Sequence, residues 1–412
     1  MSHVRSLIAV TALTSATIFG CAVGTTPENG TNAGTLPPPT TVEVGSITPA
    51  TTTDFQVRSD ARDDWLAIAQ WTHFYAITAS GATADVAQAQ NRLLVAGNDF
   101  ATQAGVVLGD GAADPLTSLL ERRAKSVIAF VGEAENGDEN AMAKERASWQ
   151  VASAQLATFF ADKLGKAHAI SALQPALFAF DAATQDEIVA RAKGDFSAEV
   201  SAADQADAQA LTVADTLAFS LAATYPAKLA PSTLTVENQS LRLELRSLLA
   251  QRAFWLRAFT IDQAAKREAQ PELDRAIKAH VAVGDVFAGF YGKDVGDQVA
   301  LGFHNLTADQ YAYLLAGQTG DASATDAIRA GWMKDASAFA HYLASINTSW
   351  TELDLNRVLQ MDVDRTLSYV EARRAAEWDA DVADYEMVIE NTGVLANTFA
   401  GGLAAAFPNA PH

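Results

Sequence analysis

The strongest candidate for chemistry in this sequence is a group of carboxylates near the C-terminus. Glu377, Asp381 and Asp384 follow one another at spacings of four and three residues, so a helix would carry them on one face. Convergent carboxylates can bind Ca²⁺ or share acid and base roles. With a formal net charge of −20, however, the chain must expose most of its acids. We therefore expect a solvated helix face, and keep these three residues as weak metal-ligand candidates.

The seven histidines do not make a second candidate site. None stands in a His-x3-His or Glu-x-x-His spacing, which would place two metal ligands on one face of a helix. His73 lies in an apolar stretch two residues after Trp71, which favours a buried structural role. The sequence also lacks a Gly-x-Ser-x-Gly elbow, a phosphate loop and a dinucleotide fingerprint. We therefore expect no catalytic residues, no metal and no cofactor, and lean away from an enzyme.

The only cysteine stands at the end of an N-terminal export signal. Arg5 supplies the positive charge, and residues 7–20 form an apolar run that is too short to span a membrane. The sequence Ile18-Phe19-Gly20-Cys21 resembles the lipobox of bacterial lipoproteins, although Phe19 is bulky where a small residue is usual. The resemblance implies cleavage after residue 20 and lipid on the Cys21 sulfur. The alternative is an ordinary cleaved signal followed by an incidental cysteine.

The lipobox resemblance also predicts where the protein resides. Position 22 is not Asp, which implies the outer membrane if the cell has two membranes. Residues 21–56 hold five of the 12 prolines and little that could be buried, so we expect a disordered tether. The charge of −20 repels phosphate backbones and anionic headgroups alike. We expect no nucleic-acid partner, and attachment to the membrane through the lipid anchor.

The rest of the chain contains two similar copies of one sequence. Trp71 and Trp255 are 184 residues apart, and the Ala-Arg pairs at 190–191 and 372–373 are 182 apart. A nearly constant offset is maintained from the tryptophans to the ends of the copies, where LAATYP at 221–226 matches LAAAFP at 403–408. Shared composition alone would not hold such a register. We predict two copies, at residues 57–230 and 240–408.

Each copy has the apolar periodicity of amphipathic helices. Val213, Leu217 and Leu221, for example, recur every four residues, and no alternating strand pattern of useful length is present. We therefore predict an all-α fold of two tandem antiparallel helical bundles, each with four to six helices.

Local motifs predict where some of these helices start and stop. The segments 184–187 (TQDE) and 307–310 (TADQ) fit the capping box, which indicates a helix start at each. Gly109, Gly137 and Gly320 are natural breaks between helices.

Both copies resemble the repeat of a poorly characterised family of exported bacterial proteins, some of which carry the name glycosyltransferase. The resemblance rests on Trp65, Trp71-Thr72, the Leu-Thr-x-Leu-Leu segment at 116–120, the Gly-Asp turns and the acidic-aromatic segment 378–385. It implies a helical fold and the duplication. A sugar-nucleotide transferase needs phosphate- or metal-binding residues, and none is evident, so the name implies no activity here.

This chain departs from that family at the positions where relatives carry inward-facing histidines, which suggest a metal or proton site. Other residues stand there: Ile68, Arg123, Phe180, Asp207, Gln209, Arg252, Leu306, Asp362, Ile389 and Asn391. An arginine in such a place supplies fixed positive charge and can pair with a carboxylate such as Asp362. We therefore predict structural roles for Arg123, Arg252 and Asp362.

Together these observations favour a non-catalytic binding or interaction module that is lipid-anchored at the cell envelope. Its partner would be another envelope protein or a small-molecule ligand, held in the groove between the copies. Two alternatives are a helical-bundle enzyme or metal-binding protein, and a structural envelope protein.

Overall fold

The part of the chain that the structure describes is built from helices. The computed structural model describes residues 52–109, 111–165 and 170–408, so Cys21, the predicted signal and most of the predicted tether lie outside it. Apart from an isolated β-bridge between Thr53 and Ala230, every regular element in these ranges is a helix. The predicted all-α class is confirmed. None of the described helices is both long and apolar enough to cross a membrane.

The helices fall into two runs along the chain. The first half contains α1 (Asp54–Ser80), α2 (Val86–Val95), α3 (Asn98–Leu108), α4 (Ala113–Asn136), α5 (Glu139–Leu164), α6 (Ile170–Ala192), α7 (Phe196–Thr224) and the short 3₁₀ helix η1 (Pro226–Lys228). The second half contains α8 (Val236–Ala264), α9 (Gln270–Tyr291), α10 (Lys293–Thr319), α11 (Ala322–Ile346), α12 (Glu352–Arg374) and α13 (Trp378–Ala406).

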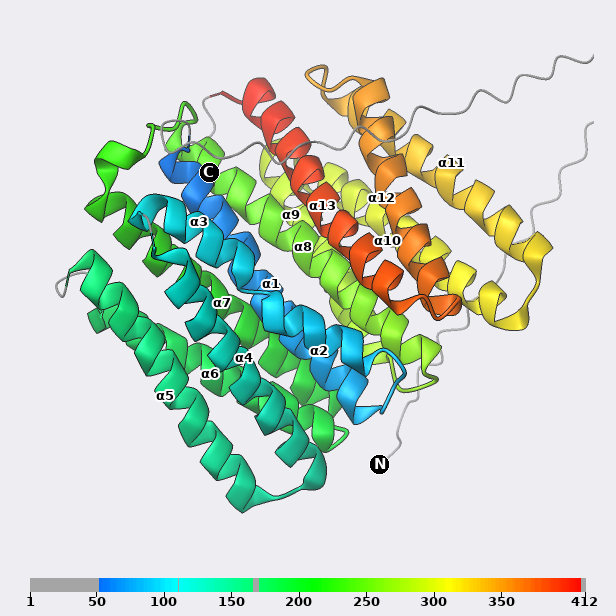
Figure 1. Ribbon diagram of the computed structural model, residues 1–412. Helices are drawn as coiled ribbons and strands as arrows, with labels where there is room; N and C mark the ends of the chain where they lie inside the picture. The colour runs from blue at the N-terminus through cyan, green and yellow to red at the C-terminus, as the bar shows by residue number, and fades with distance from the viewer. Residues whose placement is uncertain (1–51, 110, 166–169, 409–412) are drawn as a thin grey trace, which may run out of the picture. The chain divides into compact units, whose positions relative to one another are not determined.

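The first helix of each half lies at the centre of the helical body. Figure 1 shows α1 and α8 side by side, with α4, α5 and α6 on one side of them and α10, α11 and α12 on the other. Every residue of α1 from Ile68 to Thr78 is buried, and so is every residue of α8 from Arg252 to Asp262. Helices buried on all sides need a partner for each polar side chain.

Several predicted boundaries agree with the structure and others do not. Gly109, Gly137 and Gly320 each follow the last residue of a helix with positive φ, so these predicted breaks are confirmed. The predicted tether ran to residue 56, but α1 already begins at Asp54. Thr53 makes this earlier start possible, because its side chain accepts a hydrogen bond from the Gln56 backbone N–H at 3.0 Å.

Both predicted capping boxes are wrong, because they lie inside helices. Thr184 is in the middle of α6, where its hydroxyl donates to the Phe180 carbonyl at 2.9 Å. Thr307 is in the middle of α10, and its Oγ1 lies 3.2 Å from Nε2 of the buried His280. A threonine hydroxyl satisfied by the preceding turn or by a neighbouring helix has no need of a helix end.

Candidate functional site

Two buried arginines join the first half of the chain to the second. Arg191, near the end of α6, places Nη2 2.6 Å from Asp262 Oδ1 at the end of α8. Arg373, near the end of α12, places Nη2 2.6 Å from Oδ2 of Asp85, which lies between α1 and α2. Each arginine therefore bridges from one half to a carboxylate beside the central helix of the other.

The surroundings of the two arginines correspond at the offsets found in the sequence. Glu199 and Asp381, which are 182 residues apart, each accept from the arginine of their own half, at 3.1 and 2.9 Å. His73 and Arg257 are 184 apart, and each approaches that same carboxylate. His73 Nε2 lies 3.8 Å from Glu199 Oε1, and Arg257 Nη2 lies 2.8 Å from Asp381 Oδ2. This correspondence supports the predicted duplication, which remains a prediction.

The cluster around Arg191 is sealed from solvent and suits structure better than catalysis. His73 Nδ1 lies 2.8 Å from Glu187 Oε1, and both residues are at most 2% exposed. Burial lowers the pKa of His73 to about 4 and raises the pKa of Glu187 well above its usual range. Glu272 is fully buried, and burial beside Asp262 and Glu199 raises its pKa to about 9. These groups hold protons, but a substrate cannot reach them.

The three C-terminal carboxylates do not converge. Glu377 is exposed at the start of α13 and Asp384 is half-buried, whereas Asp381 is 1% exposed and paired with Arg257 and Arg373. The predicted solvated face is therefore wrong for Asp381, because a net charge describes the chain and not each carboxylate. Within the described ranges, no three His, Cys, Asp or Glu side chains are placed to hold a metal ion.

The arginines predicted to be structural lie in buried pairs. Arg252 Nη1 is 3.0 Å from Asp362 Oδ2 and joins α8 to α12. Arg123 Nη2 is 2.7 Å from Oδ1 of Asp181, a partner that the sequence did not suggest, and joins α4 to α6. Removing one member of such a pair leaves the other buried and uncompensated, which costs about 3–5 kcal/mol.

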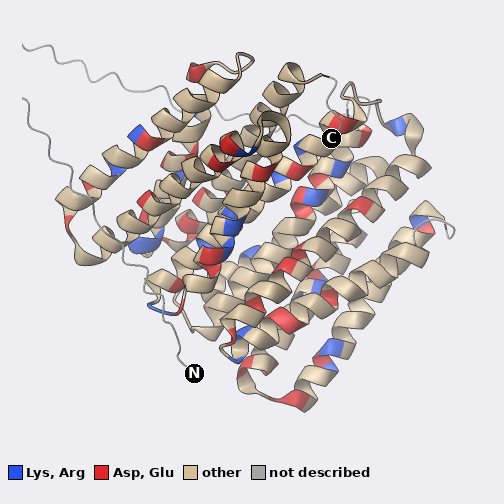
Figure 2. Ribbon diagram, turned by 180° about the vertical axis from the view of Figure 1, so that it is seen from behind, with Lys and Arg blue, Asp and Glu red and all other residues tan. Residues whose placement is uncertain are grey.

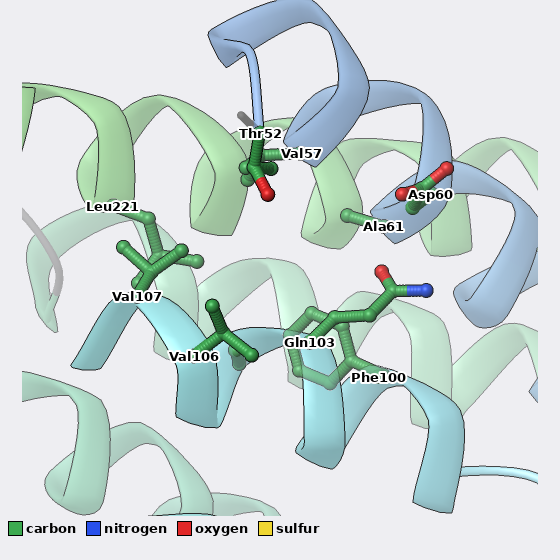
Figure 3. A pocket seen from close by; sticks show the side chains of 10 residues that line it. Thr52, Val57, Asp60, Ala61, Phe100, Gln103, Val106, Val107 and Leu221 are labelled. Carbon is green, nitrogen blue, oxygen red and sulfur yellow. The ribbon is translucent and has the colours of Figure 1, made fainter. Parts of the chain in front are cut away.

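Two small cavities lie along α1. The cavity in Figure 3 is enclosed by α1, α3 and α7, with Phe100, Val107 and Leu221 among its apolar walls and Gln103 at its edge. Its volume is about 20 Å³, enough for little more than one water molecule. A second cavity, of about 30 Å³, lies between α1, α8 and α13. Neither is large enough for an organic ligand.

A much larger cavity, here called the end cavity, lies where α8, α10 and α12 end. Its volume is about 290 Å³, near the lower limit of about 300 Å³ for small-molecule sites. Buried walls come from Asp85, Ile261, Leu314, Val370 and Arg373, and the half-buried or exposed walls come from Thr83, Ala264, Ala265, Gln318, Arg374 and Trp378. The cavity therefore combines an apolar interior with polar groups at its mouth.

The end cavity is open because a small residue stands where the other half has a large one. Arg267 is 184 residues after Thr83 and donates from Nε to Asp262 Oδ1 at 2.7 Å. Its guanidinium also occupies the space that a side chain on Gly81 would need. At the corresponding place in the end cavity, Thr83 is too short to fill the space.

Sequence analysis missed the end cavity and both arginine bridges. The useful signal was the Ala-Arg pair that recurs at 190–191 and 372–373, because an arginine repeated on an otherwise apolar helix requires a buried partner. Comparisons with protein-family models, with curated proteins and with solved structures found no match for this chain. The arguments about its function therefore rest on its own residues.

Proposed function

We propose that this protein is a non-catalytic binding module at the cell envelope, and that it holds a small molecule in the end cavity. The observation that carries the proposal is the size of this cavity. At about 290 Å³ it is several times larger than the cavities of about 20 and 30 Å³ along α1. Its apolar walls and a few polar groups at the mouth are typical of small-ligand sites.

The groups that line the end cavity favour binding over catalysis. The lining contains one carboxylate, Asp85, whose pKa is lowered despite its burial because Arg373 lies beside it. A carboxylate held ionised in this way is a poor general base. Thr83 is the hydroxyl of the lining, and no histidine, cysteine or lysine lines the cavity with it to activate a nucleophile.

The location at the envelope rests on the N-terminal sequence. The lipobox-like segment ending at Cys21 supports export and lipid attachment, and the acidic body favours an anchor that does not depend on anionic headgroups. Figure 2 shows acidic and basic positions interspersed along the central helices, and no extended basic surface is visible in this view. A module held by lipid would present the end cavity to small molecules outside the cytoplasm.

The binding proposal is tested by filling the cavity. Thr83→Arg places at this position the residue that occupies position 267, so it should block the end cavity while the helical circular dichroism spectrum is retained. We expect fragments that give saturation-transfer NMR signals with the wild-type protein to lose them with this variant. Thr102→Arg, at an exposed position of α3, is the control and should retain them. A wild-type protein that binds no fragment blocked by Thr83→Arg would contradict the proposal.

A further inference from the structure

We propose that the end cavity selects a small organic anion, with its carboxylate at Arg374 and its apolar part against the cavity interior. This inference rests on the proposed binding function and adds the chemical class of the ligand. It follows from the hydrogen-bonding groups of the mouth, from the balance of charges beside it and from the nature of its walls.

The first step concerns the donors at the mouth. Arg374 is the last residue of α12, its side chain is exposed, and none of the described residues makes a hydrogen bond or an ion pair with it. Its guanidinium therefore offers five N–H donors in a planar fork, a geometry that matches the two oxygens of a carboxylate. Deeper in the cavity, Arg373 has a buried Nε that also lacks a hydrogen-bond partner.

The second step concerns the charges. Arg373 is already balanced, because its Nη2 contacts both Asp85, at 2.6 Å, and Asp381, at 2.9 Å. Asp381 is shared with Arg257. Three arginines, with Arg374 included, thus face two aspartates, and the sum is one positive charge. An anion would complete this balance, whereas a cation would add to the excess.

The nearest acid along α12 is already engaged. Glu371 accepts a hydrogen bond from the Tyr313 hydroxyl and lies 3.9 Å from Arg329 Nη1. It therefore leaves the Arg374 guanidinium available to a ligand.

The third step concerns the body of the ligand. Ile261, Leu314 and Val370 supply buried apolar walls, and the half-buried Trp378 adds an aromatic ring. One side of that ring is occupied, because the guanidinium carbon of Arg373 lies 5.5 Å from its centroid. A compact apolar group of about one ring suits a cavity of about 290 Å³, and a free inorganic anion would leave these walls without contact.

The alternative to an anion has its own physical basis and must be tested directly. The C-terminal ends of α8, α10 and α12 lie at this cavity, and the carbonyl groups there favour positive charge. We therefore choose three probes of nearly the same shape: phenylacetate as the anion, phenylacetamide as the neutral form and phenethylamine as the cation. Titration calorimetry on the purified protein compares their dissociation constants.

The expected order is phenylacetate tightest, then phenylacetamide, then phenethylamine. Arg374→Gln should weaken phenylacetate about tenfold or more and phenylacetamide much less, because a charged hydrogen bond is lost only with the anion. Arg357→Gln is the matched control. Arg357 is exposed on the same helix, 17 residues earlier and so about 25 Å away, and should leave all three constants unchanged.

Each result decides between distinct conclusions. Equal affinities for the three probes, or tightest binding of phenethylamine, would overturn the anion proposal and leave the binding function intact. So would an Arg374→Gln variant that binds phenylacetate as the wild type does. If none of the probes binds and no fragment is blocked by Thr83→Arg, the binding function fails as well. Circular dichroism melts of both arginine variants verify that they remain folded.

Discussion

At the scale of single residues, this protein holds many ionisable groups where water does not reach. Their charges are arranged in pairs and clusters, such as Arg252 with Asp362 and Arg191 with Glu199 and Asp262. Carboxylates outnumber the cations around Arg191, and burial raises the pKa of Glu187, Glu199 and Glu272. The stability of the fold must therefore depend on pH, because these groups bind protons more tightly in the folded chain.

We predict that the protein loses stability as the pH rises from 7 to 9, and that Glu272 contributes to the loss. Its pKa is about 9 when folded against an ordinary value of 4.5. The stability it contributes is therefore fully present below pH 4.5 and is lost as the pH rises towards 9. The slope for one such group reaches about 1.4 kcal/mol per pH unit. Urea unfolding of the wild type and Glu272→Gln, which keeps a neutral side chain, measures this contribution.

The same experiment needs two precautions. His73 has a lowered pKa of about 4, so its contribution is present above pH 6.5 and is lost as the pH falls through 4. Measurements above pH 7 avoid this opposite effect. Glu237→Gln, at an exposed position of α8, is the control and should keep the wild-type slope. If Glu272→Gln loses stability as steeply as the wild type, Glu272 does not carry the proton that we assign to it.

At the scale of elements, α9 and α10 approach each other through glycines. A Cβ on Gly284 of α9 would lie 2.5 Å from the carbonyl oxygen of Gly296, and a Cβ on Gly296 would lie 2.6 Å from the carbonyl oxygen of Gly284. Both contacts involve backbone, which cannot turn away as a flexible side chain does. The close crossing of this hairpin therefore depends on two residues without side chains.

We predict opposite effects for two glycine-to-alanine changes on α9. Gly284→Ala should destabilise the protein by about 1–3 kcal/mol, because the helices must separate to admit the methyl group. Gly289→Ala should stabilise it by about 0.5–1 kcal/mol, because a Cβ there meets no atom within 4 Å and alanine favours the helix. Urea unfolding of both variants checks the prediction. Equal effects of the two changes would show that the α9–α10 crossing is not set by Gly284.

At the scale of the whole molecule, the two halves share their innermost contacts. Besides the two arginine bridges, Glu386 of α13 accepts from Trp71 Nε1 at 2.8 Å and from Arg92 Nε at 2.9 Å. The predicted copies at 57–230 and 240–408 therefore meet through buried charge as well as through apolar side chains. The end cavity belongs to both halves, since Thr83 and Asp85 come from the first and its other walls from the second.

We predict that Cys21→Ser prevents lipid attachment and releases the protein from the membrane fraction. Cys21 is the only cysteine of the chain, and the described helices provide no membrane-spanning alternative. Incorporation of labelled palmitate, followed by cell fractionation, measures both effects. Ser46→Ala, in the same predicted tether, is the control and should be labelled as the wild type is. Equal labelling of the wild type and Cys21→Ser would refute the lipid anchor.

Local patterns in the sequence were sufficient for the class of fold and for some helix ends. Glycines such as Gly137 end helices because their backbone adopts positive φ, a property of the residue itself. The capping-box patterns failed because a threonine hydroxyl in mid-helix finds other acceptors, as Thr184 does in α6. The same limit applied to Asp381, since its burial depends on helices that are remote in the sequence.

By itself, the sequence determined the helical class and the internal repeat, because apolar periodicity and a constant offset are properties of the chain. Only the tertiary structure decided which buried charges meet. Arg373 and Asp85 are 288 residues apart, and no local pattern joins them. Only the tertiary structure, likewise, decided where a cavity remains. Whether Thr83 leaves a space depends on the helix ends that surround it, and these are brought together by the packing of α1 against α8.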